Sequence, residues 1–184
     1  MSRLDSVLRR LQAQRDCLDL AVRLVRDLPG PVFELGLGNG RTYDHLRERC
    51  PERDIFVFDR QVAAHVDCIP DAGHFFEGPV EETLDSVHRR FAGRVALAHA
   101  DLGSGQPVRD ACTAAMLSTK LAWFMAPGGV IASDQELYLP AAEAVALPAG
   151  VPSGRYFLYR WCAAPPEPER AAIQDHSRSR TTGT

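Results

Sequence analysis

A series of short apolar segments, alternating with helical patterns, constrains the fold of this chain more than any other feature. Five of these segments are predicted to be buried strands: residues 32–35, 55–58, 73–76, 94–100 and 129–133. Apolar residues at helical spacing lie between the third and fourth segments and between the fourth and fifth. The alternation predicts a doubly wound, Rossmann-like α/β fold. It is a three-layer sandwich with a mostly parallel sheet and a ligand crevice outside the carboxyl ends of the strands.

The two ends of the chain have different patterns from its middle. Residues 1–28 carry apolar residues at helical spacing among arginines and aspartates, which predicts an amphipathic helical segment packed on or capping the domain. The domain itself is predicted to span residues 29–162, with a strand at 155–162 that forms a hairpin with 144–147. Residues 163–184 have little apolar surface and are predicted to be a disordered tail. Few residues lie between Asp134 and this tail, so we expect the last strands to be shortened.

Charge and cysteine content exclude several classes of partner. The formal net charge is −3, and no basic block is dense enough to follow a phosphate backbone, so no nucleic-acid partner is expected. No apolar run approaches the roughly 18 residues of a membrane span, and the amino terminus lacks the apolar centre of a secretory signal. The five cysteines lie far apart without a CxxC pair, which is typical of reduced thiols in the cytoplasm. Nothing indicates an oligomeric state.

The segment ELGLGNGRT, residues 34–42, carries most of the chemical information. Gly36, Gly38 and Gly40 stand between a predicted strand and a predicted helix, where glycines allow positive φ and let a ligand lie against bare backbone. Asp59 follows at the end of the second strand, at the distance typical of the acid in nucleotide-binding βαβ units. The combination predicts a nucleotide-type cofactor over this turn.

The glycine spacing and one acid distinguish between two kinds of cofactor. Dinucleotides favour GxGxxG, whereas this turn is GxGxG with Arg41 at the next position. Glu34, just before the glycines, would repel a pyrophosphate but would complement the ammonium and sulfonium of S-adenosylmethionine. An NAD-dependent oxidoreductase is therefore the less favoured alternative.

The glycine turn followed by Asp59, together with the segment APGGVI at residues 126–131, resembles class I S-adenosylmethionine-dependent methyltransferases. The resemblance spans residues 31–135 and implies that S-adenosyl-L-methionine is the cofactor. It implies that the glycine turn holds the methionine moiety, that Asp59 accepts hydrogen bonds from both ribose hydroxyls, and that the turn after the third strand flanks the adenine. The cofactor-binding residues so implied are Glu34, Gly36, Leu37, Gly38, Asn39, Thr42, Asp59, Arg60, Gly78, Pro79, Val80 and Asp101.

Three residues near the predicted carboxyl edge of the sheet are candidates for catalysis. The implied reaction is a direct displacement, which needs a base only when the nucleophile carries a proton. Asp101, His99 and Asp134 are the candidate bases; the two aspartates could instead cap turns, and His99 could be a buried core residue. Asp134-Gln135 also resembles the metal-binding Asp-Asn of catechol-type O-methyltransferases. However, position 135 is Gln and no lysine follows Asp101, so we expect activity without a metal.

The acceptor is not identified by any motif. We expect a small molecule, because the chain shows no sign of a nucleic-acid or membrane partner. The alternative is a catalytically silent S-adenosylmethionine-binding or scaffold protein, since the short carboxyl half leaves little chain to close an acceptor pocket.

Overall fold

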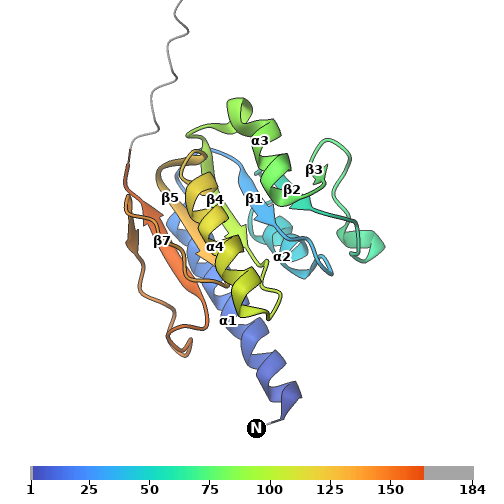
Figure 1. The fold of residues 1–184 in the computed structure, drawn as a ribbon, viewed down its shortest axis with the longest axis vertical. Helices are drawn as coiled ribbons and strands as arrows, with labels where there is room; N and C mark the ends of the chain where they lie inside the picture. The colour runs from blue at the N-terminus through green and yellow to red at the C-terminus, as the bar shows by residue number, and fades with distance from the viewer. Residues whose placement is uncertain (1, 164–184) are drawn as a thin grey trace, which may run out of the picture.

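The computed structural model describes residues 2–163, which form a three-layer α/β sandwich around one sheet (Figure 1). The seven strands have the order β3-β2-β1-β4-β5-β7-β6. The first five are mutually parallel, and β7 runs antiparallel to both β5 and β6. The strands are β1 (Val32–Leu35), β2 (Ile55–Asp59), β3 (Phe75–Glu77), β4 (Val95–Ala100), β5 (Met125–Ser133), β6 (Ala142–Ala144) and β7 (Phe157–Trp161). The predicted fold class is confirmed.

Two helices cover each face of the sheet. α1 (Arg3–Leu24) and α2 (Arg41–Arg49) pack on one face, and α3 (Val80–Phe91) and α4 (Pro107–Leu121) on the other (Figure 1). A short 3₁₀ turn, η1 (Val66–Cys68), lies in the connection from β2 to β3. α1 begins with a capping box in which Ser2 and Asp5 each accept the other's backbone N–H. Among the described residues, no helix is both long enough and apolar enough to cross a membrane.

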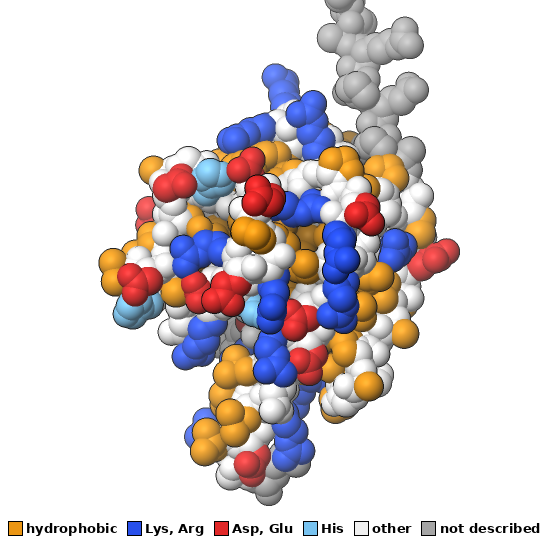
Figure 2. Space-filling model, turned by 180° about the vertical axis from the view of Figure 1, so that it is seen from behind, with side chains coloured by type: hydrophobic (Ala, Val, Ile, Leu, Met, Phe, Trp, Pro, Cys, Tyr) orange, Lys and Arg blue, Asp and Glu red, His pale blue; other side chains and the backbone are white. Residues whose placement is uncertain are grey.

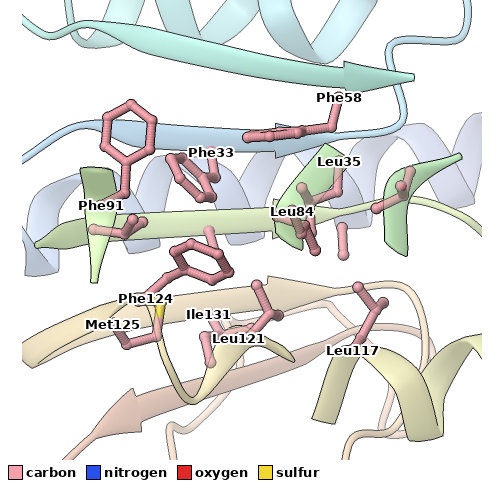
Figure 3. Close-up of a cluster of buried hydrophobic side chains, with 14 of the residues drawn as sticks. Phe33, Leu35, Phe58, Leu84, Phe91, Leu117, Leu121, Phe124, Met125 and Ile131 are labelled. Atoms are coloured by element: carbon pink, nitrogen blue, oxygen red, sulfur yellow. The ribbon is translucent and has the colours of Figure 1, made fainter. Parts of the chain in front are cut away.

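The core has two halves because successive strand residues point to opposite faces. On the α3/α4 face, Phe33 lies at the centre of a cluster of aromatic rings (Figure 3). Its ring centroid is 4.8 Å from that of Phe58, 5.2 Å from Phe91 and 5.3 Å from Phe124, at tilted and edge-on angles that aromatic pairs favour. Val32 belongs to the opposite half, under α1 and α2. The same period of two therefore places Glu34 on the α1/α2 face.

Several element boundaries differ from the sequence prediction for local reasons. β3 starts at Phe75 rather than at position 73, because Asp71 accepts the backbone N–H groups of Gly73 and His74 and holds them in a turn. β6 lies two residues earlier than predicted, and its pairing with β7 continues through the bond from Val145 N–H to the carbonyl of Leu158.

The shortening predicted for the last strands falls on β6, which has 3 residues. All seven strands of the sheet are nevertheless present, and β7 reaches back to pair with β5. The predicted tail lies, apart from Ala163, outside the described residues.

Candidate functional site

The glycine turn after β1 is closed on the sheet side and open on the other. Gly36 has φ +97 and donates its N–H to the carbonyl of Phe58 at 2.9 Å. A Cβ at Gly36 would lie 2.7 Å from the carbonyl oxygen of Asp101, so only glycine fits against β4 here. Gly38 has φ +48, and a Cβ there would meet nothing within 4 Å. The turn therefore offers bare backbone to a ligand, with exposed Asn39 beside it.

Asp59 joins the ends of β1, β2 and β3. Its Oδ2 accepts the Gly38 N–H at 3.0 Å, and its carbonyl accepts the Gly78 N–H at 2.9 Å. Its Oδ1 has only a long contact, 3.5 Å from the backbone N of Gln61. The half-buried carboxylate therefore keeps acceptor capacity for hydroxyl groups, as a ribose-binding acid requires.

The remaining predicted cofactor residues differ in exposure. Arg60 and Pro79 are exposed, and Gly78 is half-buried at the end of β3. The side chains of Leu37 and Val80 are buried in the apolar core on opposite faces of the sheet, so only their backbone can meet a ligand at this edge.

A largely buried polar chain runs beneath the glycine turn. Glu34 and His99 are paired in register across β1 and β4, and both are 0% exposed. His99 Nδ1 lies 2.6 Å from Glu34 Oε2, the hydroxyl of Thr42 donates to Glu34 Oε1, and His99 Nε2 is hydrogen-bonded to the hydroxyl of Tyr156. Both oxygens of Glu34 and both ring nitrogens of His99 therefore have partners inside the protein. In this arrangement His99 holds Glu34 and Tyr156 in place, and it has no free ring nitrogen to take a proton from a methyl acceptor.

Charge and burial act in opposite directions on His99. Burial by itself would lower the pKa of His99, but the charge and hydrogen bond of Glu34, together with the carboxylates of Asp101 and Asp134, raise that pKa above its ordinary value. Burial, together with the carboxylates of Asp101 and Glu34, raises the pKa of Tyr156 well above its usual range. The raised pKa of His99 favours protonation of the imidazole beside Glu34, and the raised pKa of Tyr156 favours its neutral phenol.

Asp101 and Asp134 lie at neighbouring strand ends. Each follows a register pair of the parallel strands β4 and β5, in which Ala100 is opposite Ser133. Asp101 Oδ2 accepts a hydrogen bond from Gln14 Nε2 at 2.7 Å, and Arg10 Nη1 lies 3.6 Å from the same oxygen. α1 therefore reaches across the edge of the sheet and holds Asp101.

Asp134 is the more deeply placed of the two acids. Its Oδ2 accepts the Gly103 N–H at 2.9 Å, while its buried Oδ1 has no hydrogen-bond partner among the described residues. Burial and the neighbouring Asp101 carboxylate raise the pKa of Asp134 to about 6. An acid whose pKa lies near neutrality, with an unused oxygen, can exchange a proton with a ligand.

Sequence reasoning missed two residues of this network, Gln14 and Tyr156. The apolar pattern of α1 includes Leu11 and Leu18, and Gln14 occupies the apolar position expected between them, where it is 4% exposed. A polar residue at an apolar position of the helix could have indicated that Gln14 has a buried hydrogen-bond partner. Tyr156 gave no such signal, because an aromatic residue at the start of a strand is ordinary core composition.

The donors present fit a cofactor that carries hydroxyls and positive charge better than they fit a metal. The glycine turn offers backbone and open space, and Asp59 offers an acceptor. Within residues 2–163, no group of three or more His, Cys, Asp or Glu side chains could hold a metal ion. The amide of Gln135, turned to satisfy its neighbours, binds the Gly103 N–H and the carbonyl of Asp110.

Fold and site together define a class: a doubly wound α/β protein with an open glycine turn and an acid at the carboxyl edge of its sheet. A family model described as S-adenosyl-L-methionine methyltransferase matches residues 1–161, and the chain belongs to this family. A search of curated proteins returned no match.

Solved structures agree with the family. The chain is similar to an S-adenosyl-L-methionine methyl transferase from Silicibacter pomeroyi DSS-3, with 40% identity and a TM-score of 0.83 over 88% of this chain and 99% of that one. It also shares its fold with the MycE methyltransferase of the mycinamycin biosynthetic pathway, solved in complex with Mg and SAH. There the identity is 14% and the TM-score 0.54, over 79% of this chain and 45% of that one. The chain is an S-adenosylmethionine-dependent methyltransferase, so the oxidoreductase and silent-scaffold alternatives are set aside.

Proposed function

We propose that the protein transfers a methyl group from S-adenosylmethionine to a small molecule whose nucleophile gives up a proton in the reaction. The observation that carries this proposal is the pair of carboxylates at adjoining strand ends, Asp101 and Asp134, beside the glycine turn. The net charge of −3 supports a small acceptor over a nucleic acid. All five cysteines are free thiols, which supports a reducing compartment such as the cytoplasm.

The cofactor would lie along the strand ends, and it supplies an electrophilic methyl group on a sulfonium. Gly36, Gly38 and Asn39 would contact its methionine moiety, because the turn is open there. Asp59 would accept the ribose hydroxyls, and the backbone at Gly78 would flank the adenine. Glu34 has both oxygens engaged by Thr42 and His99, so its contribution would be to fix the turn from below.

Asp134 would take the proton. The acceptor's nucleophile forms a bond to the methyl carbon while the carbon–sulfur bond breaks, with its electron pair staying on sulfur, and the nucleophile's proton passes to the Asp134 carboxylate. Asp101 exposes 27% of its side chain and would orient the acceptor by accepting a hydrogen bond from it. Gly103 covers Asp134, so access for the acceptor requires that the Gly103 N–H leave Oδ2.

The test is methyl transfer from labelled S-adenosylmethionine to a panel of small hydroxyl and amine acceptors. Asp134→Asn is expected to lower kcat by about 10²–10⁴, the usual contribution of a positioned base, with cofactor affinity unchanged. In the wild type, kcat/KM should rise with pH through about 6, where Asp134 loses its proton, and this rise should be absent in the variant. Asp85→Asn, an exposed acid on α3, is the matched control. Full turnover by Asp134→Asn with an unchanged pH profile would refute the assignment.

A further inference from the structure

A cavity of about 430 Å³ lies between α1 and the segment that leads into β7. Its lining includes Arg9, Ala13 and Asp16 from α1, and Pro152 and Arg155 from the other wall. The volume is within the range of small-molecule sites. The lining carries charged side chains among apolar ones, so a small ligand with an ionic group fits it.

The walls of the cavity are continuous in the chain with two residues of the polar network, although none of its lining residues belongs to that network. Ala13 is the chain neighbour of Gln14, which binds Asp101, and Arg155 is the neighbour of Tyr156, which binds His99. β7 begins opposite Ser133, the residue before Asp134. The wall formed by residues 150–155 therefore lies beside the carboxyl end of β5, the edge at which the proposed site stands.

The charges of the cavity do not cancel. Arg15 and Asp16, both in its lining, form an ion pair with each other at 2.8 Å. Within the described part of the chain, neither Arg9 nor Arg155 is ion-paired with a carboxylate. Seen from behind, Lys and Arg side chains gather over the middle of the molecule, with acidic side chains among them (Figure 2). Two guanidinium groups on opposite walls suit an anion, because a guanidinium binds carboxylate or phosphate oxygens in a fixed fork.

We propose that this cavity holds an anionic group, a carboxylate or phosphate, of the methyl acceptor, with Arg9 and Arg155 as its binding residues. The proposal names the substrate class of the methyl-transfer site and in that respect rests on the proposed function. The reacting oxygen or nitrogen of the acceptor lies toward Asp101 and Asp134, and the anion anchors the other end of the molecule.

The first experiment measures anion binding without turnover. The protein is titrated with inorganic phosphate and, separately, with succinate, and binding is followed by amide chemical shifts. The double variant Arg9→Gln/Arg155→Gln is expected to weaken binding of the preferred anion at least tenfold, because it removes the charged hydrogen bonds of both guanidinium groups. The control is Arg23→Gln, which removes the same charge from the same helix but lines a different cavity. Absence of binding to the wild type, or equal loss in the control, overturns the proposal.

The second experiment compares methyl acceptors that differ only in an anionic group, such as 4-hydroxybenzoate and phenol. The wild type should prefer the carboxylate-bearing acceptor, and the double variant should lose this preference through a higher KM with kcat retained. A preference that survives in the double variant overturns the proposal. If neither acceptor is methylated, the anion titration decides the proposal by itself, and failure of the proposed base is recognised separately by the pH profile of Asp134→Asn.

Discussion

The buried pair of His99 and Glu34 yields the sharpest prediction for stability. His99→Leu removes the imidazolium 2.6 Å from Glu34 and leaves a carboxylate that is 0% exposed with only the hydroxyl of Thr42 as a partner. It also removes the partner of the Tyr156 hydroxyl. Breaking a buried ion pair on one side costs about 3–5 kcal/mol, so we expect the free energy of unfolding to fall by that amount.

The double variant Glu34→Leu/His99→Leu separates the cost of an orphaned charge from the cost of lost packing. It removes both charges and replaces them with apolar side chains, so it should be more stable than His99→Leu despite carrying one more substitution. Urea unfolding curves of the wild type, both variants and His65→Gln, an exposed histidine as control, give the four free energies.

The pH dependence of the same curves tests the charge state. Because Glu34 raises the pKa of His99 in the folded protein, protonated His99 stabilises the fold fully below its ordinary pKa of 6.5. This contribution is lost as the pH rises through the raised pKa, and the double variant should lack the loss. The reasoning would be refuted if the free energy of unfolding of His99→Leu lay within about 1 kcal/mol of the wild-type value. It would also be refuted if the double variant were less stable than His99→Leu.

Three further predictions concern the carboxylates. Asp134→Asn should stabilise the fold by about 1–3 kcal/mol near pH 7 and by nothing below pH 4, because the raised pKa of Asp134 makes its ionisation costly only above its ordinary pKa; thermal melts at both pH values check this. Asp59→Ala should weaken S-adenosylmethionine binding by about 1.5–3 kcal/mol in calorimetry, and unchanged affinity would mean that Asp59 only braces Gly38. Methyl transfer should continue in EDTA; its loss on chelation and recovery with magnesium would show instead that Asp101 and Asp134 bind a metal.

The sheet could be predicted because the central strands are mostly apolar, with single polar residues at Glu34 in β1 and His99 in β4. Strands that are buried on both faces must lie inside a sheet covered by helices on each side. The helices between successive strands require parallel crossover connections. The ends of elements were harder to predict. The start of β3 depends on the hydrogen bonds of Asp71 in the preceding turn, and the position of β6 depends on its pairing with β7. Neither interaction has a periodic signal in the sequence.

The sequence predicted which residues lie at the strand ends of the site. It did not predict the hydrogen bonds that join the buried residues beneath them. The glycine turn, Asp59, Asp101 and Asp134 all lie at the predicted edge of the sheet. Glu34 was expected to face the cofactor, although its alternation with Val32 directs it under α1 and α2, where it pairs with His99. The sequence did not indicate which helix would cover that face, and therefore did not predict the pairing.

The polar network can be completed only late in synthesis, because its members lie far apart in the sequence. The bond between Gln14 and Asp101 joins residues 87 positions apart, and that between His99 and Tyr156 joins residues 57 apart. Contacts between residues so far apart in sequence form late, because closing a long loop costs conformational entropy before the contact itself stabilises the chain. The Glu34–His99 pair can form once β4 is made, but it gains its phenol cap only when β7, the last strand of the sheet, has been synthesised. Nascent chains that end before β7 should therefore leave the His99 side chain hydrated, which makes protection of this pair a late marker of folding.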